Sequence, residues 1–261
     1  MIKALFFDID GTLISFKTHC VPESTISAIK KAKEKGVKVF ISTGRPLQLI
    51  CGLEKLKPYI DGYITANGAY CYVGENTLCK KCIPEEDVRQ VIRHAEKLGV
   101  ACLIVGTKSI AVVNKDEQFL DVFIKMLKIP TLDFLVENVE DVIKEGVLQM
   151  TPFFDKKMEE DALNGTKGCN SGRWHPDFVD ITAKGIDKGE GLERVASHFE
   201  MKISETMAFG DGGNDLPIIK KAGIGVAMGN ATDDVKAGAD FVTTHIDNDG
   251  ILNALKEFNV I

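Results

Sequence analysis

The chain has 261 residues and a hydrophobic fraction of 44%, enough apolar material for one large α/β domain or two smaller ones. Its formal net charge is −6, with Lys and Arg spread along the sequence, which argues against binding to nucleic acid or anionic membranes. Seven cysteines, an odd number in scattered positions, do not resemble a disulfide framework.

The sequence also bears on location and partners. Its amino terminus lacks a basic segment followed by an apolar stretch and a cleavage site, and no apolar run reaches membrane-spanning length. We therefore expect a cytoplasmic protein without membrane contact, and nothing in the sequence indicates an obligate protein partner.

The first predicted strand ends in two carboxylates. Ala4 to Phe7 form a short apolar run typical of a buried parallel strand, and Asp8-Ile9-Asp10-Gly11-Thr12 follows directly. Asp and Gly are common in turns, so an ordinary turn would account for this stretch. However, open α/β sheets bind ligands at the carboxyl ends of their strands, where two adjacent carboxylates suit a cation or acid–base chemistry.

A βαβ alternation continues from there. The predicted elements are a helix from Ser24 to Lys35, a strand from Val37 to Ile41, a helix from Pro46 through Leu53, and strands over residues 61–65 and 70–73. Between the second strand and its helix lies Ser42-Thr43-Gly44-Arg45-Pro46, which is either an ordinary loop or a phosphate clamp formed by Thr43 and Gly44. Asn67-Gly68 predicts a hairpin turn.

The pattern changes after Cys82. Cys79 and Cys82 have metal-ligand spacing, but no second pair accompanies them, so we interpret them as reduced cysteines. Strands interspersed with helices then predict an inserted α+β unit. Its predicted elements are helices over 85–98, 119–127 and from 155, and strands over 100–105, 110–113, 147–154, 172–174 and 178–182.

Strict alternation resumes at Gly185. Asp187-Lys188-Gly189 opens a helix through Phe199, and a strand over 206–209 ends in Gly210-Asp211-Gly212-Gly213-Asn214-Asp215, a second strand end that carries carboxylates. Further predicted elements are a helix containing Ile218 and Ile219, strands over 224–228 and 240–243, and a helix over 250–258.

Taken together, DIDGT, STGRP, IDKGEGL and GDGGND resemble the four motifs of the haloacid dehalogenase superfamily. More narrowly, the chain resembles the Cof-type sugar-phosphate phosphatases over essentially its whole length. This resemblance implies a doubly wound, Rossmann-like parallel α/β core over residues 1–81 and 185–261, with an α/β cap over residues 82–184 inserted between the second and third motifs.

The resemblance also implies the chemistry. Asp8 would be the nucleophile and Asp10 the general acid/base, and Asp10 favours phosphoryl transfer because dehalogenating members lack this second aspartate. Mg²⁺ would be bound by Asp8, the backbone carbonyl of Asp10 and Asp211. Asp215 would support the ion through a water molecule or by contacting the residues that bind it.

The phosphate group would be held by Thr43, Gly44 and Lys188, while Asn214 would orient Lys188 or the substrate. The family pattern favours Lys188 over Lys184, because Gly189 and a helix follow Lys188. Lys184 is then a solvated loop lysine.

The predicted partner is a small phosphate ester, with hexose phosphates as the leading class. Arg173 is a candidate substrate contact beside Trp174 and His175, although Trp174 could be core packing and the other two exposed.

Two alternative functions remain for this protein. One is a sugar phosphomutase or phosphotransferase using the same aspartyl-phosphate, and the other is a non-catalytic metabolite-binding protein.

Overall fold

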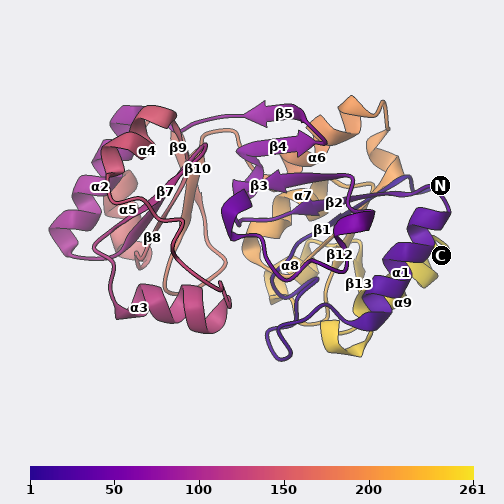
Figure 1. The fold of residues 1–261 in the computed structure, drawn as a ribbon. Helices are drawn as coiled ribbons and strands as arrows, with labels where there is room; N and C mark the ends of the chain where they lie inside the picture. The colour runs from indigo at the N-terminus through magenta and orange to yellow at the C-terminus, as the bar shows by residue number, and fades with distance from the viewer. The chain divides into compact units, whose positions relative to one another are not determined.

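A computed structural model describes residues 1–261, which form two compact units (Figure 1). Unit 1 comprises Met1–Cys79 and Asp187–Ile261, and unit 2 comprises Lys80–Ile186. None of the helices combines the length and the apolar character needed to cross a membrane.

Unit 1 is built on a sheet whose strand order is β13-β12-β11-β1-β2-β3-β4-β5. Neighbouring strands from β13 to β3 are parallel, whereas β4 runs antiparallel to β3. The strands are β1 Ala4–Phe7, β2 Lys38–Ser42, β3 Gly62–Thr65, β4 Tyr70–Val73, β5 Asn76–Lys80, β11 Thr206–Gly210, β12 Ile224–Ala227 and β13 Phe241–Val242.

Helices cover both faces of this sheet, which makes it doubly wound as predicted. The α-helices are α1 Glu23–Glu34, α6 Lys188–His198, α7 Leu216–Lys221, α8 Asp233–Ala237 and α9 Gly250–Glu257. Side chains alternate along β1, so Leu5 and Phe7 pack with α1 and α9, which contact each other near both chain termini (Figure 1). On the opposite face Phe6 stacks on Phe40, which packs against Phe199 just after α6.

Unit 2 contains an antiparallel sheet of order β7-β6-β8-β10-β9, in agreement with the predicted α+β insert. Its strands are β6 Cys102–Gly106, β7 Ile110–Val113, β8 Val147–Pro152, β9 Cys169–Gly172 and β10 Asp180–Ala183. Its helices are α2 Glu85–Leu98, α3 Glu117–Leu120, α4 Val139–Glu145 and α5 Lys156–Leu163, and α3 continues as a π-helix over Asp121–Met126.

The helix predicted from Pro46 through Leu53 is wrong. The chain forms a single 3₁₀ turn over Leu47–Leu49 and is then extended at Ile50. The carbonyl of Leu49 accepts a hydrogen bond from the side chain of Arg45 at 3.0 Å, and Gly52 has a positive φ of 77°. A tertiary contact and a left-handed residue therefore replace the continuing helix.

Candidate active site

Two neighbouring strands deliver carboxylates to one edge of the unit 1 sheet. β1 and β11 are parallel and pair in register at Phe7 and Phe209, so Asp8 and Gly210-Asp211 leave the sheet side by side. The backbone N–H of Asp8 continues the pairing by donating to the carbonyl of Phe209 at 3.1 Å. Because both strands end at the same edge, residues two hundred positions apart in sequence become neighbours.

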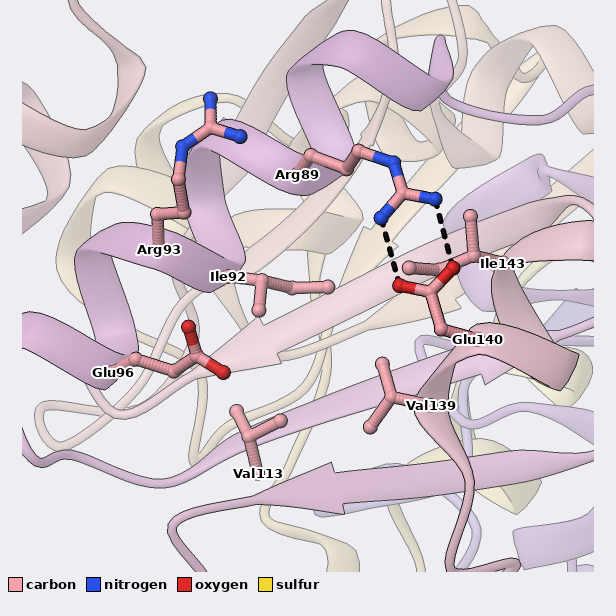
Figure 2. Close-up of a pocket in the computed structure, with 8 residues that line it drawn as sticks. All are labelled: Arg89, Ile92, Arg93, Glu96, Val113, Val139, Glu140 and Ile143. Carbon is pink, nitrogen blue, oxygen red and sulfur yellow. Dashed lines mark hydrogen bonds and ion pairs between the residues drawn. The ribbon is translucent and has the colours of Figure 1, made fainter.

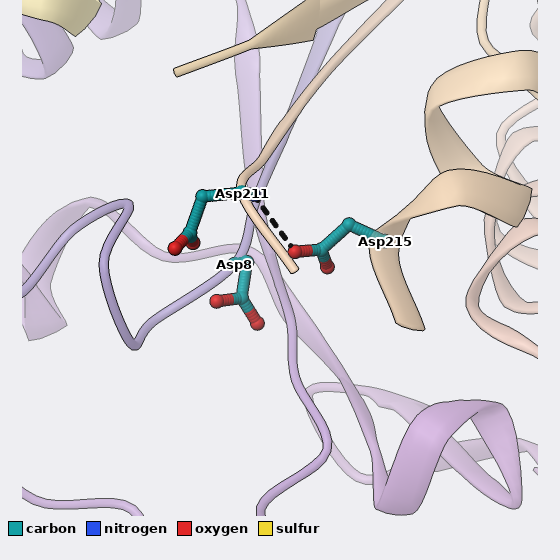
Figure 3. A group of neighbouring side chains, drawn as sticks. All are labelled: Asp8, Asp211 and Asp215. Carbon is teal, nitrogen blue, oxygen red and sulfur yellow. Dashed lines mark hydrogen bonds between the residues drawn. The ribbon is translucent and has the colours of Figure 1, made fainter. Parts of the chain in front are cut away.

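Three carboxylates converge there. One oxygen each from Asp8, Asp211 and Asp215 lies within 4.8 Å of the other two (Figure 3). Asp215 Oδ2 accepts hydrogen bonds from the backbone N–H groups of Asp211 and Gly212, both at 3.0 Å. These bonds fix the loop after β11 in a turn that keeps Asp211 and Asp215 together.

Lys188 is the cation among these carboxylates. Its side chain is fully buried, and its Nζ lies 2.7 Å from Asp8 Oδ1 and 2.5 Å from Asp215 Oδ1. It is the first residue of α6, whose N-cap Asp187 accepts a hydrogen bond from the N–H of Glu190 at 2.9 Å. Lys184 is exposed.

The cluster carries more negative charge than Lys188 offsets. Burial, followed by the neighbouring carboxylates, raises the pKa of Asp8 from 3.8 to about 7 and that of Asp211 to about 8. Burial works to lower the pKa of Lys188, but Asp215 and Asp8 outweigh it and the pKa is raised. A set of three hard oxygen donors with unbalanced negative charge fits a divalent cation such as Mg²⁺.

Thr12 and Gly11 shape the same corner. Thr12 Oγ1 donates to Asp211 Oδ1 at 3.0 Å, and Asn230 Nδ2 donates to the carbonyl of Gly11 at 2.8 Å. Gly11 has a φ of 80°, and a Cβ at this position would lie 2.2 Å from Asp211 Oδ2. Only glycine allows the loop after β1 to pass this close to the carboxylate.

Asp10 is held by an arginine. Arg45 forms a two-pronged ion pair with it, with Nε 2.8 Å from Oδ2 and Nη2 2.7 Å from Oδ1. The Arg45 and Asp10 side chains are 5% and 10% exposed, so the ion pair is almost completely shielded from solvent. Burial opposes the charge on Arg45, but the Asp10 carboxylate more than offsets this and raises the pKa of Arg45. The orientation of Asp10 is thus fixed through both of its oxygens.

The loop after β2 brings the predicted phosphate clamp to the same edge. Thr43 and Gly44 are buried, and the N–H of Thr43 donates to the carbonyl of Ile64 at 2.8 Å. Thr43 Oγ1 accepts from the N–H of Arg45 at 3.0 Å, so its hydroxyl can still donate to a ligand. Asn214 Nδ2 donates to Asn67 Oδ1 at 3.0 Å, and no hydrogen bond joins Asn214 to Lys188.

Arg173 lies in unit 2, where its guanidinium is used within the unit. It donates to the carbonyls of Phe154, Pro176 and Phe178 at 2.8 to 3.0 Å and pairs with Glu159 at 2.8 Å. These bonds join the turn between β9 and β10 to Phe154 and to α5. A contact between Arg173 and substrate stays a prediction.

Unit 2 also contains a pocket, drawn in Figure 2. Its wall includes two arginines and two glutamates, whose formal charges cancel. Arg89 pairs with Glu140 through two hydrogen bonds of 2.7 and 2.9 Å, shown as dashed lines. No site residue predicted from the sequence lines this pocket.

Four residues of the site were not assigned a role from the sequence: Thr12, Arg45, Asn67 and Asn230. The first three lie in DIDGT, in STGRP and in the Asn67-Gly68 turn, all of which were identified from the sequence. Their position in these motifs could therefore have marked them as candidates. Asn230 follows β12 without any such signal, and only the fold brings it to Gly11.

Comparisons with known proteins agree with this geometry. The family described as haloacid dehalogenase-like hydrolase matches residues 5–255. The solved structure of BT4131, titled a HAD subclass IIB sugar phosphatase, is 48% identical with a TM-score of 0.94, over 99% of this chain and 100% of that one.

A second solved structure is 47% identical with a TM-score of 0.96, and the match covers 100% of both chains. It is described as showing a conserved trigonal-bipyramidal intermediate in a phosphoryl-transfer superfamily. YcsE of Bacillus subtilis, named a 5-amino-6-(5-phospho-D-ribitylamino)uracil phosphatase, is 29% identical over 98% of this chain and 96% of its own.

Proposed function

The chain belongs to the haloacid dehalogenase-like hydrolase family and is a phosphatase, and we propose that it hydrolyses sugar phosphates with Mg²⁺ through an aspartyl-phosphate on Asp8. The observation that carries this proposal is the convergence of Asp8, Asp211 and Asp215 around Lys188 at the carboxyl edge of the sheet.

In the first step a carboxylate oxygen of Asp8 attacks phosphorus, and the bond from phosphorus to the sugar oxygen breaks. The leaving oxygen takes a proton from Asp10. In the second step a water molecule gives a proton back to Asp10 and attacks the phosphorus of the aspartyl-phosphate, which releases inorganic phosphate and regenerates Asp8. Dividing the reaction in this way helps because phosphate monoesters are among the slowest of biological substrates to hydrolyse unaided.

Arg45 supports Asp10 in this scheme. Its planar fork grips both oxygens of Asp10, which selects one orientation of the carboxylate. To deliver a proton, Asp10 has to replace one of its hydrogen bonds to Arg45 by a hydrogen bond to the leaving oxygen. We propose that Arg45 fixes the orientation of the Asp10 carboxyl group before this replacement.

Mg²⁺ would be held by Asp8, Asp211 and the backbone carbonyl of Asp10, supported by Asp215, and when bound it would lessen the repulsion between Asp8 and an anionic phosphate. The chain's own groups would bind the remaining phosphoryl oxygens. Lys188 supplies the charge, while the Thr43 hydroxyl, the Gly44 N–H and Asn214 supply directed donors.

The preference for sugar phosphates rests on the similarity to BT4131, which extends over 99% of this chain. YcsE, which is less similar, is named for a phosphorylated ribityl compound, so a polyol phosphate belongs among the test substrates.

The experiment is a measurement of phosphate release from hexose phosphates, pentose and polyol phosphates, nucleotides and pyridoxal phosphate, each with Mg²⁺ and with chelator. Wild type is compared with Asp8→Asn and with Asp233→Asn, a matched change at an exposed aspartate of unit 1. We expect hexose phosphates to rank first, and turnover to require Mg²⁺ and Asp8 but not Asp233. Turnover that persists in chelator or in Asp8→Asn would refute the mechanism, and a higher rank for another class would refute the substrate assignment.

A further inference from the structure

The buried turn Ala66–Gly68 follows β3 and has no part in the mechanism above. Its three residues all have positive φ, at 48°, 52° and 99° for Ala66, Asn67 and Gly68. Two consecutive non-glycine residues in the left-handed region are unfavourable, and such strain persists only where the surroundings hold it. Several of the contacts that hold this turn lead to the active site.

The backbone of the turn is attached to the phosphate clamp. The N–H of Ala66 donates to the carbonyl of Arg45 and the N–H of Asn67 donates to the carbonyl of Thr43, both at 3.1 Å. The turn therefore fixes the backbone on either side of Gly44, whose N–H is proposed to bind phosphate.

Gly68 packs against the residue that precedes Lys188. A Cβ on Gly68 would lie 2.3 Å from the carbonyl oxygen of Asp187, so the two backbones are in direct contact. This approach places the turn beside the first residue of α6, from which Lys188 reaches Asp8.

The side chain of Asn67 reaches the fourth motif. Its Oδ1 accepts from Asn214 Nδ2 at 3.0 Å, and Asn214 makes no other side-chain hydrogen bond. Since one N–H of the Asn214 amide is directed at Asn67, the orientation of the whole amide is set, and its second N–H remains able to donate to a ligand.

We propose that Asn67 is a positioning residue that orients the Asn214 amide so that it donates to a phosphoryl oxygen of the substrate. This inference rests on the proposed role of Asn214 in phosphate binding. Asn67 acts through Asn214 and does not itself touch the reacting atoms.

The test distinguishes the role of the Asn67 side-chain amide from that of the Asn67 backbone conformation. Asn67→Gly keeps a residue that adopts positive φ freely but removes the amide, so the turn should still form. Asn259→Gly is the matched control, because Asn259 is an exposed asparagine of unit 1 with a φ of 54°. The measurements are kcat and KM for p-nitrophenyl phosphate, binding of inorganic phosphate by calorimetry with Mg²⁺ present, and the melting temperature.

We expect Asn67→Gly to melt as the wild type does while its phosphate affinity and kcat/KM fall on the order of tenfold, the loss typical of a misplaced hydrogen bond to a charged group. Asn259→Gly should change neither. Asn214→Ala should show a similar loss, and the double variant Asn67→Gly/Asn214→Ala should be no worse than Asn214→Ala alone, because both changes remove the same interaction.

Wild-type phosphate affinity in Asn67→Gly would overturn the proposal, as would a double variant whose loss is the product of the two single losses. Phosphate binding needs no turnover and no particular ester. A failure of the sugar-phosphate assignment would therefore show in the substrate comparison, whereas a failure of this inference would show in the binding of phosphate itself.

Discussion

Replacement of Arg45 by methionine tests the buried ion pair at the centre of the site. Arg45→Met keeps most of the length of the side chain but removes the charge that faces Asp10. Asp10 would then be a carboxylate 10% exposed, having lost both hydrogen bonds of 2.7 and 2.8 Å. Lys188 cannot replace the guanidinium, because its Nζ is committed to Asp8 and Asp215.

The size of the effect follows from the burial of the pair. Removing one partner of a buried ion pair destabilises a protein by about 3–5 kcal/mol, because the remaining charge is left uncompensated. For a chain of this size that loss corresponds to a fall in melting temperature of about 6–20 °C. In the double variant Asp10→Asn/Arg45→Met the uncompensated charge is absent, so much of the stability should return.

The assay is calorimetric unfolding of wild type, the two single variants and the double variant. Its internal reference is the fluorescence of Trp174, the only tryptophan of the chain, which lies in unit 2 and outside the site. Arg45→Lys is the charge-conserving comparison, and it should fall between wild type and Arg45→Met because an ammonium cannot reproduce the two-pronged contact.

Two results would refute this reasoning. One is a loss below about 1 kcal/mol in Arg45→Met, which is the value expected of an exposed pair. The other is strict additivity in the cycle, which would show that Asp10 and Arg45 do not stabilise each other.

The remaining predictions concern the other charges. Lys188→Met should lower kcat by about 100-fold or more, whereas Lys184→Met should leave it unchanged, and the reverse order would show that the wrong lysine was chosen. In chelator, the free energy of unfolding should fall as the pH rises from about 4 to about 8, because the raised pKa values of Asp8 and Asp211 make the folded chain hold protons that the unfolded chain releases. Thermal unfolding with and without Mg²⁺ measures this, and Asp8→Asn should flatten the slope. Asp180→Ala removes the acceptor of three side-chain donors in unit 2, two of them buried, and should lower the free energy of unfolding by about 1–3 kcal/mol, measured by urea unfolding followed through the emission of the single tryptophan.

The sequence alone determined the fold class and the positions from which the site is built. Apolar runs that end in Asp8 and in Gly210-Asp211 identify strands whose carboxyl ends carry charge, and alternation with helices predicts that these ends share an edge. The structure agrees, with Asp8, Asp211, Asp215 and Lys188 in one cluster. Such predictions succeed because periodicity and strand ends are local properties of the chain.

Only the tertiary structure decided which side chains act on one another. The helix predicted after Pro46 does not form, because the Arg45 side chain donates hydrogen bonds to the backbone carbonyl of Leu49 and to the carboxylate of Asp10. The single 3₁₀ turn therefore does not continue as a helix. Asn67 appeared to be an ordinary turn residue, yet its amide meets Asn214, 147 positions further along the chain. No local pattern encodes such pairs, because the energies that select them, those of burial and of hydrogen bonds across the sheet, exist only once the strands have assembled.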